Sequence, residues 1–130
     1  MSMIRGSCLC GAVKYEVDGS LGGAVNCHCS MCRKAHGAAF ASYARVDKKA
    51  FAFVSGADRI SSYQSSADVI RTFCSRCGST LQFMRLTRPD TFWIALGTMD
   101  DDPGVRPERH IYVDSKAPWF DITDGLEQRA

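Results

Sequence analysis

Seven cysteines in three tight clusters constrain this chain of 130 residues more than any other feature of its sequence. A structural zinc ion binds four ligands in a tetrahedron, so two closed all-cysteine sites would need eight thiolates. The simplest division is one closed four-cysteine site and one three-cysteine site whose fourth position is open to water or substrate. The three clusters are Cys8 and Cys10 (C-x-C), Cys27, Cys29 and Cys32 (C-x-C-x-x-C), and Cys74 and Cys77 (C-x-x-C).

The two outer clusters have the form of zinc knuckles, short turns that present two sulfurs to one metal. A glycine, Gly11 or Gly78, follows the last cysteine of each, and glycine adopts at little cost the positive φ that such turns often need. We therefore pair the two outer clusters in one structural site, which would join the first strand to the middle of the chain. A second arrangement, in which the middle cluster shares a metal with one knuckle, stays open on spacing alone.

The middle cluster offers three thiolates, and a histidine would close it. His36 would share a helical face with Cys32, His110 can arrive from elsewhere, and His28 lies between two proposed ligands in an unfavourable position. The alternatives are a closed Cys₃His site, an open site, and a metal-free or redox cluster. An open zinc with three thiolates is a weak Lewis acid that suits a soft ligand, such as a substrate thiol held as its nucleophilic thiolate.

Short β-branched and aromatic runs bounded by Gly, Pro and Asp predict a mainly β protein with antiparallel strands. One short helix is expected over residues 30–36, with Ser30 as its N-cap and Gly37 at its C-terminal end. The start of that helix would place a favourable dipole beside Cys29 and Cys32. The expected strands are residues 12–17, 38–46, 51–54, 69–73, 81–84, 91–96 and 110–113.

Composition favours an ordinary single domain over residues 1–130, with 45% hydrophobic and 23% charged residues. No apolar run approaches the ~20 residues of a membrane helix, and the first residues lack the apolar segment of a signal peptide. We therefore expect a cytoplasmic protein, in which clustered cysteines indicate metal or redox sites. The formal net charge of +2 falls to about −1 with seven thiolates and two Zn²⁺, so we expect neither nucleic acid nor membrane as a partner.

Four segments together resemble the glutathione-dependent formaldehyde-activating family, which shares its domain with centromere protein V. The resemblance extends from about residue 3 to residue 120 and includes all seven cysteines. The segments are residues 6–13 (GSCLCGAV), 27–34 (CHCSMCRK), 73–79 (FCSRCGS) and 110–119 (HIYVDSKAPW).

The resemblance implies a β-tent fold of small antiparallel sheets organised around zinc. It implies two zinc ions, a structural one held by the two outer clusters and a second one held by the middle cluster, whose open position receives glutathione. The implied activity is that of a carbon–sulfur lyase, S-hydroxymethylglutathione synthase, in which the glutathione thiol adds to formaldehyde. A non-catalytic zinc module that binds a protein or peptide in its groove is the alternative.

Glutathione is an anionic tripeptide, so its binding requires cations near the second zinc. Arg33 and Lys34 follow the middle cluster directly, and Lys116 and Trp119 are further candidates for the groove. For each of the four, a solvated charge or a core aromatic ring is the alternative interpretation. We assign no catalytic side chain from the sequence.

Overall fold

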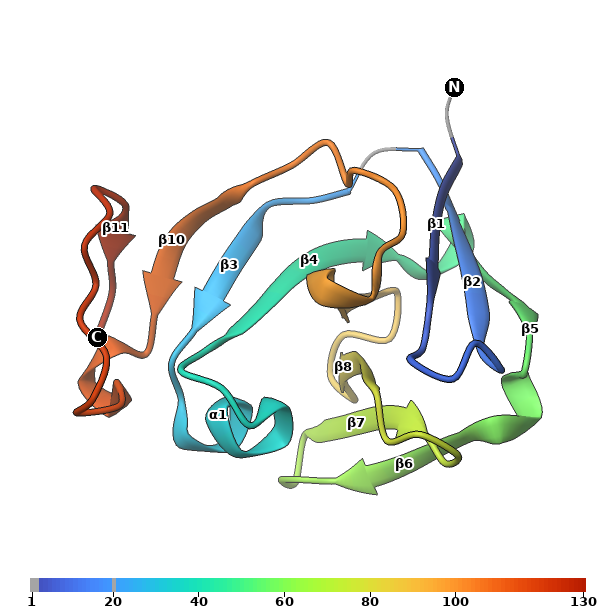
Figure 1. Ribbon diagram of the computed structural model, residues 1–130, viewed down its shortest axis with the longest axis horizontal. Helices are drawn as coiled ribbons and strands as arrows, with labels where there is room; N and C mark the ends of the chain where they lie inside the picture. Colours follow the sequence, from blue (N-terminus) through green and yellow to red (C-terminus); the bar gives the residue numbers. More distant parts are fainter. Residues whose placement is uncertain (1–2, 20) are drawn as a thin grey trace.

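The computed structural model describes residues 3–19 and 21–130 (Figure 1). In this part of the chain, strands dominate, with a single α-helix, α1 (Ser30–His36), and four short 3₁₀ turns. The prediction of a mainly β protein with one short helix is confirmed. The strands are β1 (Met3–Ser7), β2 (Lys14–Asp18), β3 (Ala24–Cys27), β4 (Ala41–Asp47), β5 (Phe51–Ser55), β6 (Ile60–Gln64), β7 (Val69–Cys74), β8 (Thr80–Arg85), β9 (Thr91–Ala95), β10 (Pro107–Ile111) and β11 (Glu127–Gln128).

The strands form two sheets. A three-stranded sheet has the order β1-β2-β5, and an eight-stranded sheet has the order β11-β10-β3-β4-β9-β8-β7-β6. The small sheet lies at one side of the molecule and β10 and β11 lie at the opposite side (Figure 1). Pairing is antiparallel except at β10, which runs parallel to both β3 and β11. Strand β10 reaches the sheet by a long connection from β9 and not by a hairpin, which allows the parallel pairing. The β-tent arrangement stays a prediction.

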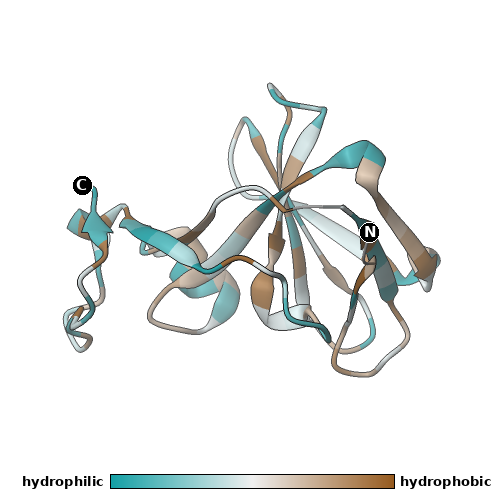
Figure 2. Cartoon of the chain, turned by 90° about the horizontal axis from the view of Figure 1, so that it is seen from above, coloured by the Kyte–Doolittle hydropathy of each residue, from teal (hydrophilic) through white to brown (hydrophobic). Residues whose placement is uncertain are grey.

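The main hydrophobic core lies between the small sheet and the middle strands of the large one. Tyr15 and Val17 of β2 pack there with Leu81 and Ile94 of β8 and β9. Strand β2 alternates exposed and buried positions, so one side of it faces this core, and Figure 2 shows hydrophobic and hydrophilic residues interspersed along the strands. A side chain at Gly6 would come within 2.1 Å of the Tyr15 ring, so the close contact between β1 and β2 requires glycine at this position.

Helix α1 has the expected bounds, but its N-cap lies one residue earlier than expected. Cys29, not Ser30, is the N-cap, because it has extended backbone angles and its Sγ accepts a hydrogen bond from the N–H of Cys32 at 3.2 Å. Gly37 ends the helix with φ of 59°, as predicted. The local sequence therefore predicts the C-cap of the helix correctly. At the N-cap, a cysteine has the role that serine usually has.

Four strands, β1, β3, β6 and β11, were not expected from the sequence. Strand β3 is buried at every position and so shows no alternation, and β6 is a mostly polar edge strand. Strands of these kinds give weak sequence signals.

Candidate metal centres and the adjoining cavity

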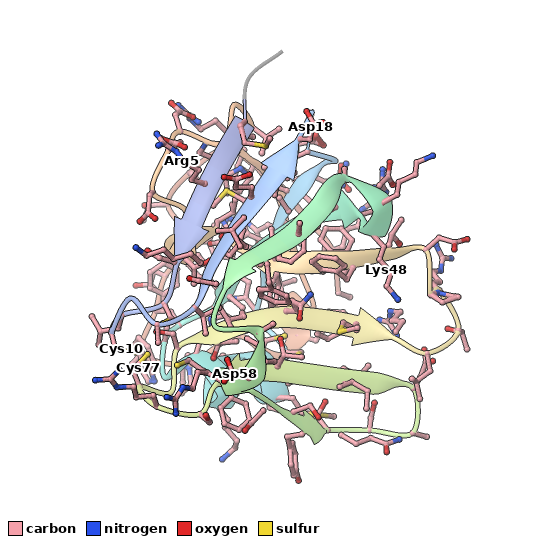
Figure 3. All side chains as sticks on the ribbon, turned by 90° about the vertical axis from the view of Figure 1, so that its right-hand side faces the viewer. Arg5, Cys10, Asp18, Lys48, Asp58 and Cys77 are labelled. Atoms are coloured by element: carbon pink, nitrogen blue, oxygen red, sulfur yellow. The ribbon has the colours of Figure 1, made fainter. Side chains whose placement is uncertain are left out.

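The two outer cysteine clusters meet in space. The four Sγ atoms of Cys8, Cys10, Cys74 and Cys77 all lie within 4.8 Å of one another, and Cys10 and Cys77 are neighbours at one corner of the molecule (Figure 3). Zn–S bonds of about 2.3 Å in a tetrahedron separate the sulfurs by about 3.8 Å. The Cys8–Cys10 and Cys10–Cys74 sulfur distances are 3.6 and 3.9 Å. The two knuckles thus lie together as the pairing requires, and the donor set fits a structural zinc, whose binding there stays a prediction.

Local turns hold the two knuckles in this arrangement. Gly11 and Gly78 have φ of 80° and 81°, and the N–H of Gly78 donates to the carbonyl of Cys74 at 2.8 Å. Hydrogen bonds from the hydroxyl and then the N–H of Ser79 lower the pKa of Cys77 to about 5. This lowering favours the thiolate form in which a cysteine binds metal.

The middle cluster forms a second, separate group. The Sγ atoms of Cys27, Cys29 and Cys32 lie within 4.8 Å of one another. Cys27 ends β3, Cys29 caps α1, and Cys32 lies in the first turn of the helix. Hydrogen bonds from the thiols of Cys27 and Cys32 lower the pKa of Cys29 to about 2. Three sulfurs converging from one loop and a helix start match the three-ligand part of an open zinc site.

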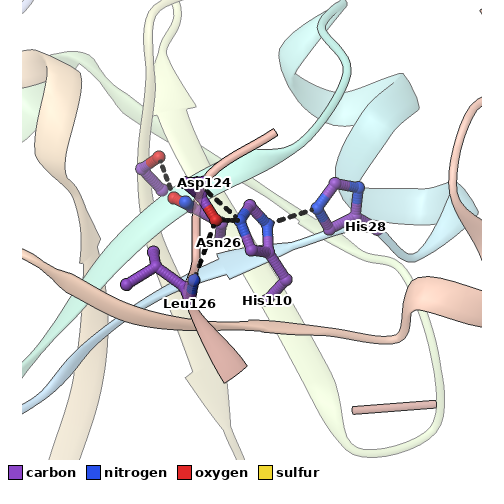
Figure 4. Close-up of polar contacts among 6 residues, drawn as sticks. Asn26, His28, His110, Asp124 and Leu126 are labelled. Atoms are coloured by element: carbon purple, nitrogen blue, oxygen red, sulfur yellow. Dashed lines mark hydrogen bonds and ion pairs between the residues drawn. The ribbon is translucent and has the colours of Figure 1, made fainter. Parts of the chain in front are cut away.

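The histidines of the described chain have other partners. Asp124 accepts a hydrogen bond from Nε2 of His110 at 3.0 Å, so Nδ1 of His110 accepts from Nε2 of His28 at 2.7 Å (Figure 4). His36 lies 2.8 Å from the hydroxyl of Tyr43. Within residues 3–19 and 21–130, neither cysteine group contains a histidine. This geometry favours the open three-cysteine site over a closed Cys₃His site.

The hydrogen bonds from His28 to His110 and from His110 to Asp124 connect the loop of the middle cluster to the C-terminal segment. Both rings are buried, and the backbone N–H of His28 also donates to the carbonyl of Ile111 at 2.9 Å. These contacts fix the backbone between Cys27 and Cys29, and so they position two sulfurs of the cluster.

A cavity of about 650 Å³ opens beside the middle cluster. Its lining combines the three cysteines with aromatic rings and a group of arginines, which together make it both apolar and positively charged. The arginine side chains come from β4, β7, β8 and the loop after β8. The lining includes Cys27, Cys29, Cys32, Tyr43, Phe83, Trp93, Arg45, Arg71, Arg85, Arg88 and Asp68.

The cations expected from the sequence lie elsewhere. Arg33 donates through Nε to the carbonyl of Ser115, and Lys116 donates to the carbonyls of Ala117 and Phe120. Trp119 is 70% exposed, so it is not a core aromatic ring. None of these residues, nor Lys34, belongs to the described lining of the cavity. These four candidates for the groove are therefore not found in the described lining, and two of them, Arg33 and Lys116, bond to carbonyls of the C-terminal segment instead.

No helix in the described part of the chain is both long and apolar enough to cross a membrane.

The fold and the two cysteine groups define a small, mainly β protein with two candidate metal centres, one of them open to a cavity. Residues 3–115 match the family model described as glutathione-dependent formaldehyde-activating enzyme. The chain belongs to this family.

Relatives of known name or structure agree with this membership. The chain is 33% identical, over 98% of its length and 85% of the relative's, to a Halomonas elongata protein whose name assigns it provisionally to the glutathione-dependent formaldehyde-activating enzymes. It is 24% identical to an uncharacterized lyase of Schizosaccharomyces pombe, over 95% of this chain and 88% of that protein. A crystal structure of a Rhodobacter sphaeroides protein matches with a TM-score of 0.65 and 25% identity, over 97% and 99% of the two chains.

Proposed function

We propose that this protein is a zinc-dependent carbon–sulfur lyase that adds an aldehyde to a thiol or removes it, resembling S-hydroxymethylglutathione synthase. The observation that carries the proposal is the position of Cys27, Cys29 and Cys32, which converge at the wall of the large cavity. A metal held there has three protein ligands and room for a fourth from the substrate. The family membership supports a thiol as that ligand.

We further propose two zinc ions per chain, a structural one between the knuckles and a second one at the middle cluster. When bound at the middle cluster, zinc supplies the positive charge that keeps a substrate thiol in its reactive thiolate form. Cys27, Cys29 and Cys32 would hold this zinc. The hydrogen bond between His28 and His110 helps to orient Cys27 and Cys29. In the closed knuckle site all four positions are taken by cysteines, so no substrate has access there.

The cavity beside the middle cluster fits an anionic thiol such as glutathione, which carries two carboxylates. Arg45 and Arg88 lie at exposed positions of the lining, where a guanidinium can bind a carboxylate through two N–H donors. The volume of about 650 Å³ lies within the range of small-molecule sites. Phe83 and Trp93 supply apolar walls, which reduce the access of water to the reacting atoms.

The substrate thiol loses its proton on binding, and its sulfur attacks the aldehyde carbon. A carbon–sulfur bond forms, the π electrons of the carbonyl move to its oxygen, and that oxygen takes a proton from solvent. The product is a hemithioacetal whose sulfur carries no charge, and such a sulfur would bind a metal more weakly than a thiolate does, which favours release.

Exchange spectroscopy on glutathione and formaldehyde tests the proposal, because the uncatalysed addition is itself facile and must be subtracted. We expect wild-type protein to raise the exchange rate above background and Cys29→Ser to abolish the increase. Equal exchange rates with and without wild-type protein would refute the proposed enzymatic activity. The non-catalytic zinc module that binds a protein or peptide would then be the better hypothesis.

A further inference from the structure

A buried arginine directly contacts the three-cysteine cluster. Arg71 lies on β7 and is only 7% exposed. Its Nη2 donates to Sγ of Cys32 at 3.5 Å, its Nη1 to the hydroxyl of Tyr43 at 3.3 Å, and its Nε to Oγ of Ser65 at 3.1 Å. The guanidinium carbon also lies 5.0 Å from the ring centre of Phe83. The cation is thus held on three sides and against an aromatic face.

The hydrogen-bond directions around Arg71 follow from its permanent charge. A guanidinium only donates, so the Tyr43 oxygen accepts from Arg71 and its own O–H donates to Nε2 of His36. Burial lowers the pKa of His36, which keeps the imidazole neutral and able to accept. This polar chain, from His36 through Tyr43 and Arg71 to Cys32, fixes the guanidinium beside the sulfur, where a flexible side chain would otherwise be free to swing away.

The charge of the cluster explains why a fixed cation is needed there. Three thiolates and one Zn²⁺ carry a net charge of −1. A substrate thiolate as fourth ligand makes the net charge −2. Cys27 and Cys32 are buried, and a buried net charge without a partner is unfavourable. Arg71 donates three of its five N–H groups to described acceptors, which leaves two for a ligand in the cavity that it lines.

We infer that Arg71 is the positioning residue that enables the three-cysteine site to accept a substrate thiolate as a fourth ligand. It acts by balancing the charge that the incoming sulfur adds, and so it sets the affinity for the thiol itself. Arg85 differs, because it lies in the same cavity but pairs with Asp68 at 3.4 Å. The inference rests on the proposed function, since it requires an open metal position.

The test is a titration of cobalt(II)-loaded protein with two thiols, glutathione and the uncharged 2-mercaptoethanol, followed by the sulfur-to-cobalt absorption bands. Because Arg71→Gln removes a hydrogen bond to a charged sulfur, we expect it to weaken the binding of both thiols by about 10- to 100-fold. Arg71→Lys keeps the charge and should restore a large part of the affinity. Arg109→Gln is the matched control, because this half-buried arginine of β10 pairs with Glu127 outside the described lining of the cavity, and it should leave 2-mercaptoethanol binding unchanged.

Each result of the titration has a distinct meaning. Equal affinity for 2-mercaptoethanol in wild-type protein and Arg71→Gln overturns the inference, as does an Arg71→Lys variant that binds as weakly as Arg71→Gln. A wild-type spectrum that responds to neither thiol instead overturns the proposed open site. The cobalt content and far-UV circular dichroism of each variant establish that it is loaded and folded. Where Arg71→Gln does not fold, Arg71→Met keeps the apolar stem against Phe83 and serves as the uncharged variant.

Discussion

Exchanging one cysteine of each cluster for serine should separate the metal that stabilises the fold from the metal that binds substrate. Cys74 ends β7, is fully buried and belongs to the main hydrophobic core. Its Sγ lies 3.9 Å from that of Cys10, which precedes β2. A metal between them therefore joins the small sheet to the large one. Serine does not ionise at neutral pH, so Cys74→Ser leaves the site with three thiolates and a buried hydroxyl.

The expected loss of stability in Cys74→Ser is as large as the net stability of the domain. A structural zinc contributes about 10–16 kcal/mol of apparent folding free energy, whereas a whole domain is stable by about 5–15 kcal/mol. Half of the metal contribution, about 5–8 kcal/mol, already equals the whole stability of a domain at the lower end of that range. We therefore expect Cys74→Ser to be unfolded or insoluble.

Cys29→Ser should behave differently because Cys29 has two roles that serine separates. Its sulfur is a proposed metal ligand, and it also accepts the N-cap hydrogen bond from the N–H of Cys32. A serine hydroxyl is a favourable N-cap, so the helix end is preserved while the metal ligand is lost. We expect Cys29→Ser to stay folded, with a change in unfolding free energy apart from metal binding of no more than about 1 kcal/mol.

The assay for this pair is urea unfolding followed by circular dichroism, together with the zinc content of each purified protein. Cys29→Ser should retain one zinc per chain and a cooperative transition. Cys29→Ala, which loses the cap as well as the ligand, should unfold at lower urea than Cys29→Ser. If Cys29→Ser unfolds as completely as Cys74→Ser, the division of roles between the two clusters is wrong.

Three further predictions concern the metals, one turn and one buried histidine. Mild chelation should remove the middle-cluster zinc first, and simultaneous loss of both metals would contradict the two-site assignment. Gly56→Ala should destabilise by at least about 1 kcal/mol in urea unfolding, because Gly56 has φ of 74° and its added Cβ would lie 2.0 Å from the carbonyl oxygen of Ala12. Gly104→Ala, with φ of 75° and open space, should cost less, and an equal loss would refute the clash. Burial lowers the pKa of His36 from its ordinary 6.5, so the unfolded state binds its proton first and stability should fall as pH drops below 6.5. His36→Gln should flatten that decline at fixed zinc concentration, and an unchanged slope would exclude this contribution.

The cysteine clusters were predictable because ligand spacing is a local property of the chain. A C-x-C or C-x-x-C turn brings its two sulfurs together whatever the rest of the fold does, and the odd count then separates a four-ligand group from a three-ligand group. The end of α1 at Gly37 was predictable for the same reason. The pairing of Cys8 with Cys74 needed one further step, the inference that two knuckles share a metal.

The cations of the cavity were not predictable, because they depend on strand order and register. Arg45, Arg71 and Arg85 lie on β4, β7 and β8, which are brought into one sheet by the order β4-β9-β8-β7. Phe83 pairs with both Arg71 and Trp93 across neighbouring strands. Proximity in sequence made Arg33 a candidate instead, and the local sequence does not reveal that its side chain bonds to the carbonyl of Ser115.

The two cysteine groups lie in different parts of the packed interior, and this separation bears on how a metal site can exchange a ligand without loss of the fold. Cys8 and Cys74 are part of the main core between the sheets, whereas Cys27 and Cys32 belong to a smaller cluster with Tyr43 and the cavity wall. A change of coordination at the smaller cluster therefore repacks few of the residues that stabilise the domain. The polar chain through Arg71 meets that cluster from the large sheet, so the rigid part of the molecule still fixes the charge beside the reacting sulfur.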